Sequence, residues 1–193
     1  MDTMTKVDVL SLSPDELSSF IVSLGEKRYR ADQIYTFLMR GAGDFSEISN
    51  IPKSLIEKLK EHAFLPAVKQ VDKRVSRDGT AKYLYELYDG EVIESVIMRY
   101  RHGNTICISS EAGCPMGCAF CASTLGGLSR KLLPSEMLSQ VIMTAKDIGE
   151  RIDGIVLMGI GEPLDNYDNV IKFLRLVNEE KGLNIGFRHI SLS

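Results

Sequence analysis

From residue 105 onward, the sequence alternates between short apolar runs and longer amphipathic segments, and this order restricts the fold more than any other feature. In chain order the segments are "TICISS", "PSEMLSQVIMTAKDIG", "GIVLMGIG", "NVIKFLRLVNEEKG" and "FRHISLS". The short runs predict strands and the long segments predict helices. Because strands joined through helices return to the same side of a sheet, the order predicts a parallel α/β sheet or barrel. The last strand would need further neighbours, so we expect this part to be incomplete.

Residues 1–66 predict a small helical domain. Ser13 is suited to be a helix N-cap, Pro14 to occupy the first turn and Glu16 to complete a capping box. Gly25 ends the apolar pattern that follows. Two further helices are expected, around "IYTFL" and after "NIP".

Residues 67–104 are richer in β-branched and aromatic side chains. Asp-Gly pairs in "RDGT" and "YDGE" are typical of tight hairpin turns, and "KYLYELY" and "VIESVIMRY" are the strands that these turns join. The sequence therefore predicts an α/β protein in three parts: the helical domain, a connecting β-hairpin segment over 67–104 and an incomplete α/β part over 105–193.

The charge balance gives no general attraction for polyanions, because the net charge is -3 and the isoelectric point is about 5.7. A nucleic acid would have to be bound by local basic groups. The candidates are "KRYR" at residues 27–30, Lys73 and Arg74 with Arg77, Arg99 with Arg101, and Arg130 with Lys131. The N-terminal stretch has no signal-peptide pattern and no run of about 18 apolar residues occurs, so we expect a cytoplasmic protein without membrane contact. In that reducing compartment, clustered cysteines are metal ligands or redox groups more often than disulfides.

The stretch "GCPMGCAFCAS" places Cys114, Cys118 and Cys121 in a C-x3-C-x2-C spacing, directly after a predicted strand. A structural zinc site needs four protein ligands, and the remaining candidates, Cys107, His102 and His189, form no second pair. Three thiolates on a [4Fe-4S] cluster would leave one iron open for a substrate. The alternative is that the three cysteines are small hydrophobic residues without a shared function.

Other polar residues are less distinctive when taken alone. In "MGIGEP", Gly161 and Glu162 suit either a tight turn or a ligand that approaches the backbone closely. Glu94 interrupts an apolar strand, which fits an outward-facing position, and Cys107 fits a buried strand position. Ser193 fits an ordinary strand end.

The cysteine spacing, with an aromatic residue before Cys121, resembles the signature of radical S-adenosylmethionine enzymes. Together with "TICISS", "GLSRKLLPSEMLSQV", "LMGIGEPLDNYDNV" and "RHISLS", it resembles the RlmN/Cfr family of RNA adenine methyltransferases. The resemblance implies the first half of a (β/α) barrel that binds S-adenosylmethionine and a [4Fe-4S] cluster. It implies the following roles: Cys114, Cys118 and Cys121 as cluster ligands; Gly161, Glu162 and Ser193 as cofactor contacts; Glu94 as proton acceptor; and Cys107 as a partner in a transient disulfide.

The activity implied by the resemblance is methylation of carbon 2 of an adenosine in large-subunit ribosomal RNA and in transfer RNA, through a methyl-cysteine. Flavodoxin or ferredoxin would be the electron donor, and we expect a monomer. No cysteine follows Cys121, so we expect an N-terminal fragment that is inactive alone. The alternatives are carbon 8 methylation, as in the Cfr branch, another radical S-adenosylmethionine enzyme, or a zinc-stabilised RNA-binding module.

Overall fold

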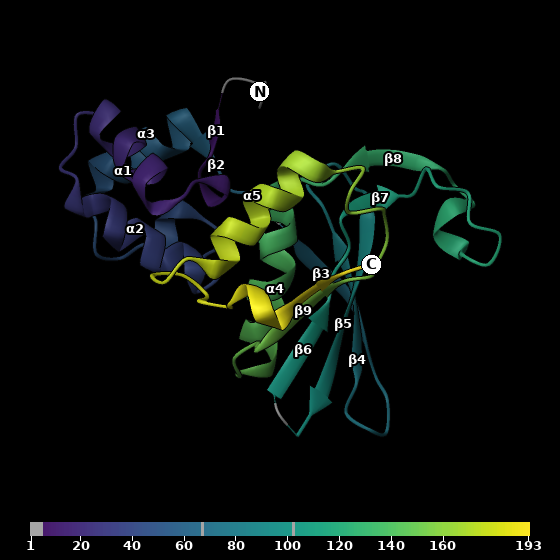
Figure 1. Ribbon diagram of the computed structural model, residues 1–193. Helices are drawn as coiled ribbons and strands as arrows, with labels where there is room; N and C mark the ends of the chain where they lie inside the picture. Colours follow the sequence, from purple (N-terminus) through teal and green to yellow (C-terminus); the bar gives the residue numbers. More distant parts are fainter. Residues whose placement is uncertain (1–5, 67, 102) are drawn as a thin grey trace.

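The computed structural model describes residues 6–66, 68–101 and 103–193. Short N-terminal helices form a group beside a six-stranded sheet, and two later helices lie between this group and the sheet (Figure 1). No helix in these three ranges has both the length and the apolar character needed to cross a membrane.

The N-terminal part is helical, as the sequence predicts. Its helices are α1 (Pro14–Ser23), α2 (Tyr29–Met39) and α3 (Lys53–His62). The expected capping box begins α1: the Glu16 N–H donates to Ser13 Oγ over 3.3 Å, and the Ser13 N–H donates to the Glu16 carboxylate over 2.8 Å. The side chains that these helices bury against one another are Leu17, Ile21, Ile34, Leu38, Leu55 and Leu59.

The sheet has the strand order β10-β9-β6-β5-β4-β3. β6, β9 and β10 run parallel to one another, as expected, whereas the pairs β3–β4, β4–β5 and β5–β6 are antiparallel. The predicted hairpin strands therefore continue the same sheet as the later strands. The strands are β3 (Lys69–Val75), β4 (Ala81–Glu86), β5 (Val92–Tyr100), β6 (Gly103–Cys107), β9 (Gly154–Leu157) and β10 (Ile190–Leu192).

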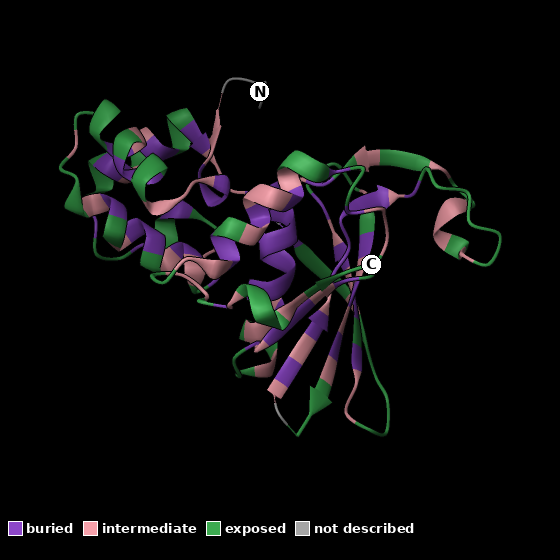
Figure 2. Ribbon diagram, in the orientation of Figure 1, coloured by how far each residue is buried: buried purple, intermediate pink, exposed green. Residues whose placement is uncertain are grey.

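Two helices cover one face of this sheet. α4 (Pro134–Ile148) packs directly on it, and α5 (Tyr167–Asn178) lies beside α4 (Figure 1). The hydroxyl of Tyr85, on β4, is 2.8 Å from that of Thr144 on α4. Along β5, buried residues on the covered face alternate with half-buried ones on the opposite face, which Figure 2 shows as alternating colours. This alternation fixes which strand residues can reach the uncovered face.

The helical part is fastened to α4 by a polar contact. β1 (Val7–Asp8) pairs in parallel with β2 (Ala63–Phe64) and so joins the two ends of the helical part. The Asp8 carboxylate accepts hydrogen bonds from the hydroxyls of Ser11, over 2.6 Å, and Ser135, over 2.5 Å. The Ser135 N–H donates to Ser11 Oγ over 3.0 Å. Burial raises the pKa of Asp8, and these hydrogen bonds oppose the rise.

A short antiparallel ribbon stands outside the main sheet. It consists of β7 (Glu111–Gly113) and β8 (Leu128–Lys131), and it was not predicted from the sequence. The run "TICISS" predicted a strand up to residue 110, but β6 ends at Cys107 and the chain then turns into this ribbon. The described part of the chain also contains 3-10 turns at Val9–Ser11, Phe45–Glu47, Ala122–Thr124 and Phe187–His189.

The capping box at α1 gives a test of the helical part. Ser13→Ala removes the side-chain acceptor for the Glu16 N–H, so we expect the free energy of unfolding to fall by about 1 kcal/mol. Urea unfolding followed by circular dichroism measures this change. Ser19→Ala is the matched control, because Ser19 lies on the exposed side of α1 and bonds only to the Asp15 carbonyl. An equal loss in both variants would contradict the capping role.

Candidate active site at the carboxyl edge of the sheet

The three predicted cofactor-binding segments follow the carboxyl ends of neighbouring parallel strands. β6 leads through Ser109 and β7 to Cys114, β9 leads to Gly161 and Glu162, and β10 ends one residue before Ser193. Because the three strands are parallel, these ends meet at one edge of the sheet. Ligands of α/β folds bind at this edge. The structure therefore brings together segments that are far apart in the sequence.

Both glycines of "MGIGEP" are required by packing. A side chain at Gly159 would place its Cβ 2.6 Å from the carbonyl oxygen of Ile108, and one at Gly161 would place it 2.6 Å from the Cβ of Glu111. Gly161 also has φ +105°, a conformation that favours glycine. Packing in a tight turn is thus sufficient to explain why both positions are glycine. It does not explain Glu162, whose carboxylate is half-buried at the edge of the sheet.

The cysteine-bearing loop projects from the β7–β8 ribbon, away from the sheet (Figure 1). Cys114 is buried at the base of the loop, Cys118 is exposed and Cys121 is half-buried, and all three thiols are free. The Cys114 N–H donates to the Gly127 carbonyl over 3.0 Å and closes the base. Gly113 faces this carbonyl so closely that a Cβ would lie 2.0 Å from the oxygen. The base is therefore tightly fixed.

The donor set of this loop fits a cluster with one open iron. Three soft thiol ligands come from one loop, and thiolates favour iron-sulfur clusters and zinc. Within the ranges that the structure describes, no three Cys, His, Asp or Glu side chains are already gathered as a metal site. A bound cluster would therefore have to draw the three thiols together. Of the earlier candidates for a fourth zinc ligand, His102 lies outside the described residues, and His189 lies in the 3-10 turn before β10.

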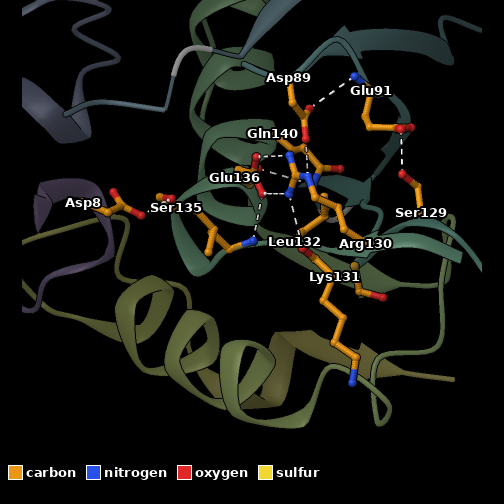
Figure 3. Close-up of polar contacts among 12 residues, drawn as sticks. Asp8, Asp89, Glu91, Ser129, Arg130, Lys131, Leu132, Ser135, Glu136 and Gln140 are labelled. Atoms are coloured by element: carbon orange, nitrogen blue, oxygen red, sulfur yellow. Dashed lines mark hydrogen bonds and ion pairs between the residues drawn. The ribbon is translucent and has the colours of Figure 1, made fainter. Parts of the chain in front are cut away.

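The ribbon is anchored to α4 by a buried ion pair (Figure 3). The Arg130 guanidinium donates to both carboxylate oxygens of Glu136, over 2.8 and 2.7 Å, and the Glu136 side chain is fully buried. One of these oxygens also accepts the Leu133 N–H over 2.8 Å. Arg130 forms a second ion pair with Asp89 in the β4–β5 turn. These acidic neighbours raise the pKa of Arg130 further above its usual value.

The two predicted catalytic residues share the uncovered face of the sheet. Cys107 is paired in register with Val96, and Glu94 lies two residues from Val96 on the same strand. The Glu94 carboxylate is 2.5 Å from the Lys82 Nζ. Both side chains line a pocket of about 260 Å³. The other lining residues are Leu84 and the ion-paired Arg74 and Asp72. Burial raises the pKa of the Cys107 thiol, partly offset by a hydrogen bond to the backbone of Met158.

Many residues of the predicted basic groups already have acidic partners. Ion pairs join Arg28 to Asp15, Lys73 to Asp147, Arg74 to Asp72, Arg99 to Glu150, and Lys131 to Asp165. Arg30 instead donates to Gln33 and lies over the ring of Tyr29, 4.8 Å from its centre. Among the described residues, no ion pair joins Lys27 or Arg30 to an acidic side chain, so these two cations are the more available ones of residues 27–30.

Glu111 is a site residue that sequence reasoning missed. It is fully buried, and its Oε2 accepts the Glu162 N–H over 2.9 Å. Its Oε1 has no hydrogen-bond partner within the described part of the chain. Burial raises the pKa of Glu111, and the neighbouring Asp165 carboxylate adds to the rise. The predicted strand ended at residue 110, and a single glutamate directly after a strand is ordinarily an exposed loop residue.

Comparison with known proteins agrees with this arrangement. The family model described as "Ribosomal RNA large subunit methyltransferase N-terminal domain" matches residues 7–65, and that of the Radical SAM superfamily matches residues 108–193. A protein of Alkaliphilus metalliredigens named "Probable dual-specificity RNA methyltransferase RlmN" is 50% identical over 98% of this chain and 54% of its own length. Its namesake in Geobacillus kaustophilus is 50% identical over 96% of this chain and 52% of its own. The chain thus spans about half the length of these relatives.

A solved structure supports the fold. The crystal structure of a radical SAM methyltransferase from Sphaerobacter thermophilus matches with a TM-score of 0.88 and 36% identity, over 96% of this chain and 56% of that one. The expected α/β fold with part of a radical S-adenosylmethionine barrel is confirmed, and the chain is of the radical SAM class. Within that class, it belongs to the RlmN family.

Glu111 gives a test of the electrostatics at this edge. A carboxyl group whose pKa is raised by folding adds stability at low pH and loses that contribution as the pH rises through the pKa of the folded state. Glutamine cannot ionise, so we expect the melting temperature of Glu111→Gln, relative to the unmodified protein, to increase between pH 4.5 and pH 8. Glu57→Gln, at an exposed position of α3, is the control and should show a constant difference. A relative melting temperature of Glu111→Gln that stayed constant or fell with pH would contradict the raised pKa.

Proposed function

We propose that this chain is the cofactor-binding part of a radical S-adenosylmethionine RNA methyltransferase. The observation that carries the proposal is the meeting of the cysteine ribbon, the "GIGEP" turn and the end of β10 at one edge of the sheet. The names of the relatives support RNA as the substrate class. The fold match supports methyl transfer as the reaction class.

Cys114, Cys118 and Cys121 would hold a [4Fe-4S] cluster and leave one iron without a protein ligand. When bound, the cluster supplies the electron that breaks a carbon-sulfur bond of S-adenosylmethionine. Glu162 offers a carboxylate to the ammonium group of this cofactor, and Gly161 is a half-buried position without a side chain that could block close approach. Ser193, at the end of β10, offers a hydroxyl from the adjoining strand. These contacts would orient the sulfonium toward the cysteine loop.

Glu94 and Cys107 would act on the uncovered face. Glu94 would accept the proton that the adenine ring loses at the methylated carbon, and the ammonium group of Lys82 beside it keeps the carboxylate in place. Cys107, as a thiolate, would attack the sulfur of the methyl-carrying cysteine, which is not among residues 122–193. The transient disulfide would form as the bond between that sulfur and the carbon attached to adenine breaks, and the carbon would take the electron pair and a proton to become the methyl group. The chain on its own is therefore expected to bind the cofactors without methylating RNA.

The finer proposals follow the RlmN branch. The whole protein would methylate carbon 2 of an adenosine in large-subunit ribosomal RNA and in transfer RNA. It would work in the cytoplasm as a monomer with flavodoxin or ferredoxin as the electron donor. Carbon 8 methylation is the competing regiochemistry, and the relatives' names favour RlmN.

Anaerobic reconstitution with iron and sulfide tests the cluster assignment. We expect a brown protein with about four irons per chain, whose reduced electron paramagnetic resonance spectrum changes when S-adenosylmethionine is added. Cys114→Ser, Cys118→Ser and Cys121→Ser should each lose most of the iron, because three ligands are the minimum for such a cluster. Cys107→Ser is the matched control and should keep it. A colourless protein with one tightly held zinc would overturn the proposal in favour of a structural zinc site.

RNA binding by the helical part is tested at Lys27 and Arg30. Replacing both with Gln removes two cations of the helical part that have no acidic partner among the described residues, so we expect RNA affinity to fall several-fold and the dependence of affinity on salt to become shallower by about two charges. Filter binding of transfer RNA at several salt concentrations measures both effects. Lys69→Gln is the control, because Lys69 already pairs with Glu86 on the far edge of the sheet. Unchanged affinity and slope in the double variant would remove this surface from the proposed RNA interface.

A further inference from the structure

The hydroxyl of Ser109 joins two segments of the proposed active site. It donates to the backbone carbonyl of Glu94 over 2.7 Å, and it accepts the N–H of Ile160 over 3.0 Å. Glu94 is the proposed proton acceptor on β5, and Ile160 directly precedes Gly161 and Glu162. One side chain from the β6–β7 connection therefore fixes the spacing between β5 and the turn after β9.

Ser109 is itself held by a residue of α4. The Gln140 amide accepts the Ser109 N–H over 2.9 Å and donates to the Ser109 carbonyl over 2.9 Å. The same Gln140 oxygen accepts the Ser95 hydroxyl over 2.8 Å. Ser109 and Gln140 are fully inaccessible to solvent, and Ser95 is 1% exposed. The N–H and the carbonyl of Ser109 are thus both hydrogen-bonded to the Gln140 side chain. In a regular β-strand, these groups would instead bond to the backbone of a neighbouring strand.

Such a network has one favourable arrangement. Water cannot replace a partner that moves away from a fully buried polar group, so each loss leaves a costly unsatisfied donor or acceptor. The side chains of Ser95, Ser109 and Gln140 are all satisfied in the structure. A packed apolar cluster would tolerate small sliding movements, but this set of directional bonds does not. The network is therefore suited to keep β5, the β6–β7 connection and the turn after β9 at fixed separations.

We propose that Ser109 and Gln140 are positioning residues for the active site. They hold the Glu94 strand and the Gly161–Glu162 turn in the relative placement that S-adenosylmethionine binding and proton removal require. This inference rests on the proposed function, because only the proposed roles of Glu94 and Glu162 require that the two residues keep a fixed relative placement. Neither residue needs to touch the cofactor or the RNA.

Ser109→Ala is the principal test, and Ser95→Ala is its matched control. Both changes remove one buried hydroxyl that bonds within this network, but only Ser109→Ala deprives the Ile160 N–H of its acceptor and Glu94 of its donor. In the cluster-free chain, we expect amide hydrogen exchange of a peptide over residues 158–162 to be at least about tenfold faster in Ser109→Ala. The same peptide should be unchanged in Ser95→Ala, and peptides of α1–α3 should be unchanged in both. Equal exchange of the 158–162 peptide in the two variants would overturn the proposal.

The second measurement addresses the cofactor. In chains reconstituted with iron and sulfide, we expect Ser109→Ala to retain the iron content of the unmodified protein and to bind S-adenosylmethionine about tenfold more weakly. If the unmodified chain takes up iron but does not respond to S-adenosylmethionine, the proposed function fails and the positioning role fails with it. If the unmodified chain responds and Ser109→Ala has the same affinity, only the positioning role fails.

A second variant covers the case in which Ser109→Ala does not fold. Gln140→Met keeps the approximate length of the side chain and introduces no charge into the buried network, but it removes both hydrogen bonds to the Ser109 backbone. We expect amide hydrogen exchange at residues 158–162 to be faster than in the unmodified protein, and S-adenosylmethionine to bind more weakly. Exchange and affinity equal to those of the unmodified protein would show that the hydrogen bonds between Gln140 and Ser109 do not position the turn.

Discussion

β6 is bonded to an antiparallel neighbour, β5, on one side and to a parallel neighbour, β9, on the other. Its pairing with β5 brings Cys107 beside Val96 and close to Glu94. Its pairing with β9 brings the connection toward the cysteine loop beside the turn that carries Gly161 and Glu162. A shift of one residue in either pairing would turn Cys107 toward α4 and separate these groups. The candidate site therefore depends on the two registers of one five-residue strand.

The registers are reinforced by polar side chains of α4 that water does not reach. Glu136 and Gln140 lie one helical turn apart, and both are fully buried. Glu136 binds Arg130 on the ribbon, and Gln140 binds Ser109 beyond β6. Breaking one partner of a buried ion pair is strongly destabilising, by roughly 3–5 kcal/mol. α4 thus orients the site through directional contacts, while its apolar residues supply the packing.

The sequence was most informative where local rules act alone. The capping box at Ser13 began α1 as predicted, and the period-two pattern of "VIESVIMRY" coincides with β5. The alternating order of strands and helices predicted the parallel arrangement of β6, β9 and β10. The cysteine spacing led to the radical S-adenosylmethionine class. These features depend on neighbours in the chain, so one sequence was sufficient to find them.

Long-range contacts could not be foreseen in the same way. The β7–β8 ribbon has a three-residue strand, and it is joined to α4 by the ion pair between Arg130 and Glu136, which was not predicted from the sequence. Ser109 was predicted as the end of a regular strand and Glu111 was not singled out, yet both are buried because the turn after β9 packs over them. Pairing Glu94 with Lys82 required knowledge of which strands are adjacent. In each case a polar residue was placed by a partner at least six positions away.

The uneven burial of the three clustered thiols has a chemical consequence. Oxygen and peroxide attack a thiol only when they can reach it, and Cys118 is exposed whereas Cys114 is buried at the closed base of the loop. Handling of the metal-free chain in air would convert Cys118 to its sulfenic acid first. Since the exposed Cys118 makes no part of the core, such damage would leave the melting behaviour intact and would be detected by mass, by thiol titration or as lost iron uptake.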